Sequence, residues 1–89
     1  MIHDLKILKS FADSIISGDK TFEIRKKERE YQKDDKIKFY VLDDQTHESC
    51  YHPIMNKLYE ITYILSGWGI KEDYVVFSIK EAADGNKEN

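Results

Sequence analysis

The most informative stretch of this chain is GDKTFEIR, residues 18–25. A short helical pattern ends at its first residue, and a strand pattern begins within three residues. The strand alternates, so Phe22 and Ile24 share one face while Thr21, Glu23 and Arg25 share the other. The second face therefore carries a hydroxyl, a carboxylate and a guanidinium in one row.

Two interpretations of this polar face remain open. In the first, Lys20, Thr21, Glu23 and Arg25 form one wall of a binding cleft. Arg25 would then contact a phosphate or a base edge, Lys20 would lie near a phosphate, and Glu23 would accept from an exocyclic amine. In the second, Glu23 and Arg25 form an ordinary ion pair on a solvated strand, which contributes little to stability.

The segment that follows is strongly charged and has no clear period, so we expect an exposed loop over residues 26–33. Lys26, Lys27 and Arg29 either contact phosphates or belong to a solvated surface, since Glu28 and Glu30 lie among them. Aromatic residues flank this region at Tyr31 and Tyr40. They either stack on bases or lie half-buried at the edge of the core.

Outside this stretch, alternation predicts four further strands, over residues 2–8, 36–42, 58–65 and 74–80. The positions expected to face inward are His3, Leu5, Ile7, Ile37, Phe39, Val41, Tyr59, Ile61, Tyr63, Leu65, Val75, Phe77 and Ile79. Before residue 18, a helix of about two turns is expected, with Ser10 as its N-cap and Gly18 closing it. His3 either reaches the cleft as an acid or base, or is a hydrogen-bonded core residue.

The remaining segments are expected to be connections. Residues 33–35 resemble a turn, residues 43–56 a long irregular loop, and residues 82–89 a frayed tail. Trp68 is expected to cover an open end of the core. We therefore predict one domain over residues 1–81. It should be α+β but β-rich, a curled sheet or small barrel of five to six strands with one short N-terminal helix.

Composition limits the class of protein. The chain has 89 residues, a net charge of −3 and one cysteine, Cys50, and 35% of its residues are charged. These values predict a monomeric, cytoplasmic domain without a disulfide or a membrane span. The acidic balance argues against strong nonspecific nucleic-acid binding. However, eight of the fourteen basic residues lie between residues 20 and 38, which favours one docking face for a polyanion.

A second cluster has metal-ligand residue types. His47, Cys50 and His52 lie close together, with Glu48 beside them. A structural zinc site needs four ligands, usually in spaced pairs, and only three good candidates exist here. We therefore expect no metal site and no cofactor.

The motifs resemble those of a known family. The strand HDLKIL (residues 3–8), the segment SGDKTFEIRK (residues 17–26) and the segments ITYIL (61–65), GIK (69–71) and YVV (74–76) are similar to PUA-like domains of the ASCH superfamily. The central segment resembles that superfamily's Gly-x-Lys-Thr-x-x-x-Arg signature. The resemblance covers residues 3–80 and is greatest to small bacterial and phage proteins of the DUF3850 type.

This resemblance implies a pseudo-barrel with a cleft beside the signature, binding RNA or a nucleotide through Lys20, Thr21, Glu23, Arg25, Lys26, Lys27, Arg29 and His3. It also implies an alternative, a small hydrolase acting on a modified nucleoside or on RNA through Lys20, Glu23 and Thr21. In the amidohydrolases of the superfamily, a threonine lies three residues after the motif lysine. This chain has Glu23 there, which cannot act as a hydroxyl nucleophile. A second departure is Asp34, where relatives tend to have glycine.

Overall fold

The computed structural model describes residues 1–82. Its elements are β1 (Ile2–Leu8), α1 (Lys9–Ser17), β2 (Phe22–Lys26), β3 (Lys36–Leu42), the short 3-10 helix η1 (Pro53–Asn56), β4 (Tyr59–Leu65) and β5 (Tyr74–Glu81). The predicted α+β, β-rich fold with five strands and one short N-terminal helix is confirmed. Apart from residue 82, the predicted tail lies outside the described residues. Within residues 1–82, no helix has the length and apolar character needed to cross a membrane.

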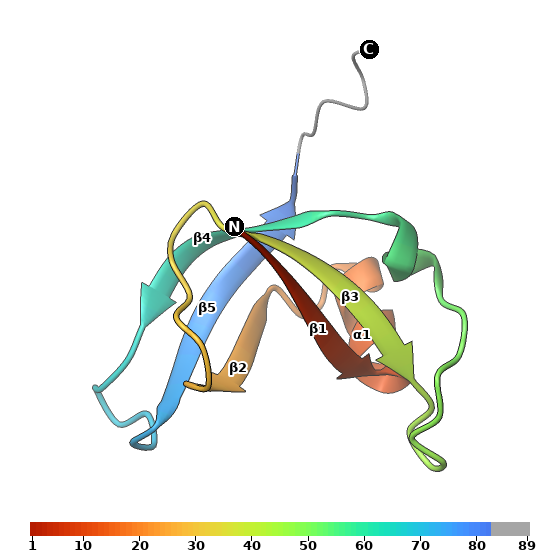
Figure 1. The fold of residues 1–89 in the computed structure, drawn as a ribbon, viewed down its shortest axis with the longest axis horizontal. Coiled ribbons are helices and arrows are strands. Elements are labelled where there is room, and N and C mark those ends of the chain that lie inside the picture. Colours follow the sequence, from red (N-terminus) through yellow and green to blue (C-terminus); the bar gives the residue numbers. More distant parts are fainter. Residues whose placement is uncertain (83–89) are drawn as a thin grey trace.

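The five strands form a single sheet that bends into a half-barrel. Their order is β1-β3-β4-β5-β2, with β1 and β3 parallel and the other neighbours antiparallel. β3 and β4 pair only through Lys36–Glu60 and Ile37–Tyr59, so the sheet bends sharply at this short junction. The resulting arch has β1 and β3 in one arm and β4, β5 and β2 in the other (Figure 1). β1 and β2 are therefore the two free edges of the sheet.

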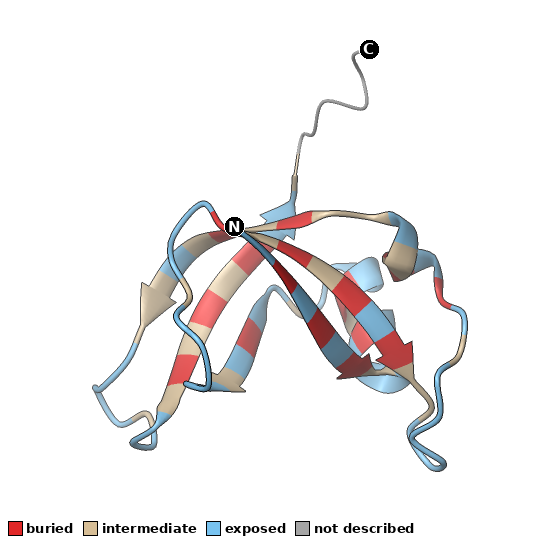
Figure 2. Cartoon of the chain, viewed as in Figure 1, coloured by how far each residue is buried: buried red, intermediate tan, exposed pale blue. Residues whose placement is uncertain are grey.

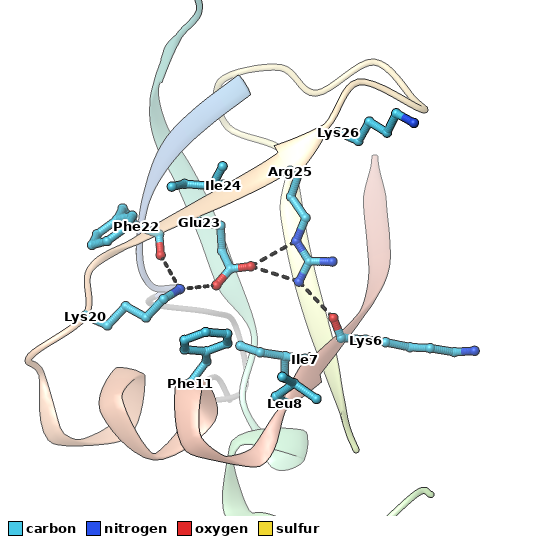
Figure 3. Close-up of a pocket in the computed structure, with 10 residues that line it drawn as sticks. All are labelled: Lys6, Ile7, Leu8, Phe11, Lys20, Phe22, Glu23, Ile24, Arg25 and Lys26. Carbon is cyan, nitrogen blue, oxygen red and sulfur yellow. Dashed lines mark hydrogen bonds and ion pairs between the residues drawn. The ribbon is translucent and has the colours of Figure 1, made fainter. Parts of the chain in front are cut away.

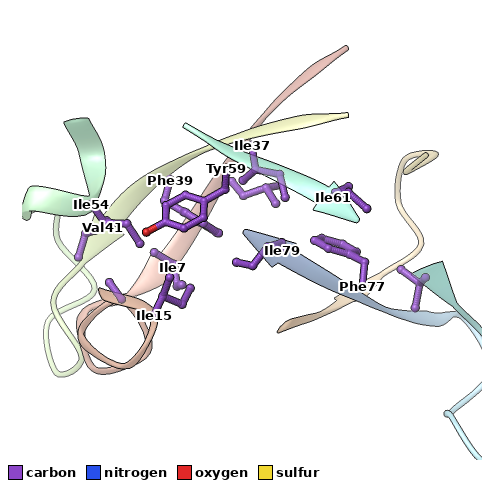
Figure 4. Packing of buried hydrophobic residues seen from close by; sticks show 13 residues of the cluster. Ile7, Ile15, Ile37, Phe39, Val41, Ile54, Tyr59, Ile61, Phe77 and Ile79 are labelled. Atoms are coloured by element: carbon purple, nitrogen blue, oxygen red, sulfur yellow. The ribbon is translucent and has the colours of Figure 1, made fainter. Parts of the chain in front are cut away.

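The core fills the inside of the arch. Alternate residues of β1, β3 and β5 are buried, as the sequence predicts (Figure 2). α1 adds Ala12 and Ile15, and η1 adds Ile54 (Figure 4). Each large apolar side chain that is fully buried stabilises the fold by about 1.5–3 kcal/mol. Because α1 is too short to be stable in isolation, its contacts with β1 and β3 hold it in place.

The two ends of α1 differ in how well the sequence predicts them. Gly18 has φ +90° and its N–H donates to the carbonyl of Ile15 at 3.1 Å, so the expected left-handed C-cap is confirmed. The expected N-cap is wrong, because the helix begins at Lys9 after Leu8 and has no side-chain cap. Ser10 instead donates to the Asp44 carboxylate through its backbone N–H (2.9 Å) and its hydroxyl (2.6 Å). A carboxylate from a distant loop thus takes the role expected of a local cap.

β4 contains a β-bulge that the alternation does not reveal. Ile61 is opposite Ile79, but Tyr63 is opposite Ser78, so one extra residue is inserted in β4. Such an insertion shifts the register of the side chains that follow it. The prediction that Tyr63 faces inward is therefore wrong, since it is 64% exposed, and Ile64 packs against the core in its place.

Two predictions about the connections are also wrong. Trp68 does not cover the core; it lies in a turn with φ +55° and is 90% exposed. The segment 43–56 is not wholly irregular, because it contains η1 and buries His52 and Ile54. His52 organises this segment, since its Nδ1 accepts from the N–H of Ile54 at 3.1 Å.

Candidate functional site

The candidate site is a groove between the two free edges of the half-barrel. It encloses about 410 Å³ and lies between the end of β1, the start of α1 and the whole of β2 (Figure 3). Its lining residues are Lys6, Ile7, Leu8, Phe11, Lys20, Phe22, Glu23, Ile24, Arg25 and Lys26. The groove therefore exists because the sheet does not close into a full barrel.

The polar face of β2 is the face turned into the molecule. Glu23 is only 3% exposed, whereas Ile24 on the opposite face is 56% exposed. The interpretation of Glu23 and Arg25 as an ion pair on a solvated strand is wrong, although the ion pair itself is present. A buried carboxylate is costly unless it is paired and hydrogen-bonded, so the surrounding cations must account for this arrangement.

Glu23 is held between two cations. Its Oε1 accepts from Arg25 Nε at 2.9 Å and lies 2.8 Å from Arg25 Nη2. Its Oε2 accepts from the ammonium of Lys20, which also donates to the carbonyl of Phe22 at 2.7 Å. The network thus fixes the position of both cations at the base of the groove.

Arg25 also links the two edges of the sheet. Its Nη2 donates to the carbonyl of Lys6 at 2.8 Å. This carbonyl belongs to β1, an edge strand whose outward backbone groups have no neighbouring strand to pair with. The guanidinium therefore connects the two free edges of the sheet through this hydrogen bond.

Two phenylalanines lie beside the Lys20 ammonium. Its Nζ is 5.4 Å from the ring centroid of Phe11 and 5.0 Å from that of Phe22. Both separations fall within the range of cation–π attraction. Both rings are also partly exposed, so they present aromatic surface at the side of the groove.

The groove continues beyond Arg25 into a second hollow of about 340 Å³. Lys6, Arg25 and Lys26 line both hollows, and the second adds Asp4, Leu5, Glu28, Arg29 and Tyr31. Tyr31 is half-buried, with its ring 4.8 Å from those of both His3 and Phe77, which favours its interpretation as a core-edge residue. Tyr40 is exposed on β3.

Lys27 lies in a third hollow together with Arg29 and Tyr31. Lys26, Lys27 and Arg29 are all exposed. Lys26 and Arg29 form no ion pair with another residue of the described part of the chain. The basic residues at the end of β2 and after it therefore lie in a solvated rim of mixed charge, since Asp4, Glu28 and Glu30 line the same hollows.

Thr21 and His3, which the sequence grouped with the cleft, lie apart from the groove. Thr21 lines a different hollow, with Ile15 and Lys57, and its carbonyl accepts from the N–H of Ile79 at 3.0 Å. His3 is buried, and its Nε2 lies 2.7 Å from Asp35 Oδ2. Neither residue is among the groove's lining residues.

His3 and Asp35 join β1 to the turn before β3. Asp35 also accepts from the backbone N–H of Gln32 at 3.0 Å. Burial acts to raise the pKa of Asp35, but the hydrogen bonds from His3 and Gln32 outweigh it and hold the pKa below its usual value. In the same turn Asp34 has φ +76°, a left-handed conformation that glycine adopts without steric cost.

The structure also shows where the residues of the cluster with metal-ligand residue types lie. His52 uses both ring nitrogens, since Nδ1 accepts from Ile54 and Nε2 therefore carries the proton that it donates to Asp13 at 2.7 Å. His47 is exposed in a turn and Cys50 is a half-buried free thiol. Within residues 1–82, no three His, Cys, Asp or Glu side chains are placed to hold a metal ion.

Sequence reasoning missed the apolar walls of the groove. Phe11 belongs to the apolar stripe of α1 and Leu8 ends β1, so both resemble core residues in the sequence. Phe22 lies on the outward face of β2. The turn between α1 and β2 places the Lys20 ammonium beside its ring, which the alternation of the strand does not predict. The signal available in the sequence was a phenylalanine on each side of the motif lysine, Phe11 and Phe22. Their spacing alone assigns both phenylalanines to packing.

The comparisons with known proteins place this geometry in a family. Residues 2–79 match the model of a family described as a domain of unknown function, DUF3850. The chain belongs to the DUF3850 family. A search of curated proteins found no match. All groove-lining residues lie within the DUF3850 match, because they fall between residues 6 and 26.

Proposed function

We propose that this DUF3850 domain binds RNA or a nucleotide in the groove between β1 and β2. The observation that carries the proposal is the buried carboxylate of Glu23, which holds Lys20 and Arg25 side by side at the base of the groove. Cations that are positioned before binding lose little conformational entropy when they contact a phosphate or a base edge.

Two further observations support the same ligand class. Lys6 and Lys26 line the groove together with Lys20 and Arg25, against the single carboxylate of Glu23, so a phosphate at its rim would meet positive charge. The likeness of residues 17–26 to the signature of the ASCH superfamily of PUA-like domains also supports RNA or a nucleotide, because that superfamily is expected to bind its ligand beside the signature.

The geometry favours binding over the hydrolytic alternative. A general acid or base must reach the substrate, but Glu23 lies behind the side chains of Lys20 and Arg25 and accepts hydrogen bonds from both. Thr21 is outside the groove. Glu23 is therefore better suited to hold the two cations than to transfer a proton.

Arg25→Ala tests the proposal. The labelled protein is titrated with short single-stranded RNAs and nucleotides, and chemical-shift changes are followed by NMR. We expect shifts at residues 20–29 of the wild type and a loss of about 1–3 kcal/mol of binding free energy in the variant. Affinity should also fall as salt rises.

Lys33→Ala is the matched control, since it removes a positive charge from an exposed turn where the Lys33 ammonium pairs with Asp34 at 3.6 Å. It should bind nearly as well as the wild type. Dispersed amide spectra establish that each variant is folded. A folded Arg25→Ala protein with wild-type affinity would contradict the proposal.

A further inference from the structure

The hydrogen-bonding capacity that remains at the base of the groove is almost entirely that of donors. An ammonium has three donors and a guanidinium has five. Lys20 uses one donor on Phe22 and one on Glu23, which leaves one. Arg25 donates from Nε to Glu23 and from Nη2 to Lys6, and its Nη2 also lies 2.8 Å from Glu23, so the two hydrogens of Nη1 are left over.

The one acidic side chain in the groove lining does not offset these donors. Glu23 Oε1 already accepts two contacts from Arg25, and Oε2 faces Lys20. The side chain of Glu23 is 5% exposed, against 16% for Lys20 and 22% for Arg25. A ligand at the base of the groove therefore meets the two cations and not the carboxylate, so an exocyclic amine finds no free side-chain acceptor there.

The walls of the groove indicate which part of a nucleotide reaches this base. Ile7, Leu8, Phe11 and Phe22 make them mainly apolar and aromatic. Such walls suit the flat faces of a base, which stacks on aromatic rings whatever its identity. A phosphate is better placed at the exposed rim, beside Lys6 and Lys26, where it stays partly hydrated.

From these contacts we infer that the groove selects keto bases, uracil, guanine or hypoxanthine, over the amino bases cytosine and adenine. The inference rests on the proposed function and adds its base specificity. A carbonyl oxygen at the base of the groove accepts from the spare donors of Lys20 and Arg25. An amino group in the same place can only donate, so it cannot pair with the spare donors of Lys20 and Arg25. These donors would lose their water without gaining a partner, which is unfavourable.

The backbone of β2 does not alter this preference. Thr21 hydrogen-bonds to Ile79 of β5 and Lys27 to Asp73 directly before it, so the backbone groups of Phe22, Ile24 and Lys26, which alternate with them, point away from β5. The carbonyls of Phe22 and Lys26 already accept from Lys20 Nζ and from the N–H of Glu28. Three backbone N–H groups thus stand against the one carbonyl of Ile24 along this edge, which does not favour an amino base.

The test compares pairs of ligands that differ in this one feature. Inosine and adenosine 5′-monophosphates differ at the keto or amino group of the six-membered ring, as do the uridine and cytidine monophosphates. Dissociation constants are measured by NMR titration of the intact chain, and then with oligouridine and oligocytidine tetramers. We expect roughly tenfold tighter binding of the keto member of each pair.

The outcomes separate this inference from the proposed function. Equal binding within each pair, or a preference for the amino member, would overturn base selection and leave nucleotide binding intact. No shift with any monophosphate or tetramer would overturn both.

Arg25→Gln supplies a second arm. The glutamine amide offers an acceptor as well as donors. The ratio of the dissociation constants of the amino and keto members should therefore fall towards one, while Lys33→Gln should keep the wild-type ratio. A folded Arg25→Gln protein with an unchanged ratio would show that Arg25 does not read the base.

Discussion

Glu23→Gln should destabilise the fold substantially, although the substitution changes the size of the side chain little. In the wild type, two cations share one buried carboxylate. Glutamine removes the negative charge and leaves Lys20 and Arg25 close together with no anion between them. The glutamine amide has one acceptor oxygen and one NH2 donor group, so it can accept a hydrogen bond from only one of the two cations.

The expected loss is about 2–3 kcal/mol. Removing one partner from a buried ion pair costs about 3–5 kcal/mol in general. The side chains of Lys20 and Arg25 keep 16% and 22% exposure, so they can recover some hydration, and the glutamine oxygen can still accept from Arg25. A domain of this size has a free energy of unfolding of about 5–10 kcal/mol, so the variant should remain folded.

Urea denaturation followed by circular dichroism measures the effect. With a slope of about 1 kcal/mol per molar urea, the midpoint should fall by about 2–3 M. Glu72→Gln, at an exposed position in the turn before β5, is the control and should change the free energy of unfolding by less than about 0.5 kcal/mol.

A double-mutant cycle with Lys20→Met then tests whether the network acts as a unit. The two substitutions should cost less together than the sum of the single changes, because each removes part of the same interaction. A Glu23→Gln protein as stable as the Glu72→Gln control would refute the argument that the buried carboxylate organises the groove.

Three further predictions concern the parts of the fold that support the groove. Asp35→Asn should reduce the acid sensitivity of the protein: the folded-state pKa of Asp35 lies below 3.8, so its contribution to stability is present above that pH and is lost as pH falls through the folded value. Thermal unfolding from pH 6 to pH 3 measures this, and an unchanged pH profile would contradict the assignment. Phe77→Ala should cost about 3–5 kcal/mol because it opens a cavity beside Tyr31, whereas Tyr63→Ala should cost less than about 0.5 kcal/mol; similar urea midpoints for the two variants would argue against the β-bulge in β4. Gly18→Ala should cost about 1 kcal/mol from backbone strain alone, since φ is +90° and nothing lies within 4 Å of the added Cβ, and a neutral effect on thermal stability would show that the left-handed cap is not required.

Much of the architecture follows from local pattern. Alternation correctly predicted the inward faces of β1, β3 and β5, and the glycine at the end of α1 correctly predicted where the helix stops. These features depend on side-chain period and on the φ angle of a single residue, both of which the chain carries locally. The β-bulge in β4 and the exposed Trp68 have no such local signal, so alternation misplaced Tyr63 and Trp68.

The candidate site also combines features that local sequence predicts with features that depend on tertiary contacts. Strand alternation alone predicts that a carboxylate and a guanidinium share one face of β2, with a lysine two residues before the strand, because successive side chains of a strand alternate. That this face turns inward follows from tertiary contacts. That outcome depends on the unclosed edge of the half-barrel and on the carbonyl of Lys6, which lies nineteen residues from Arg25 in the chain. Whether a charged face is buried is set by the partners that remote segments bring to it, and the order of residues within one strand does not contain that information.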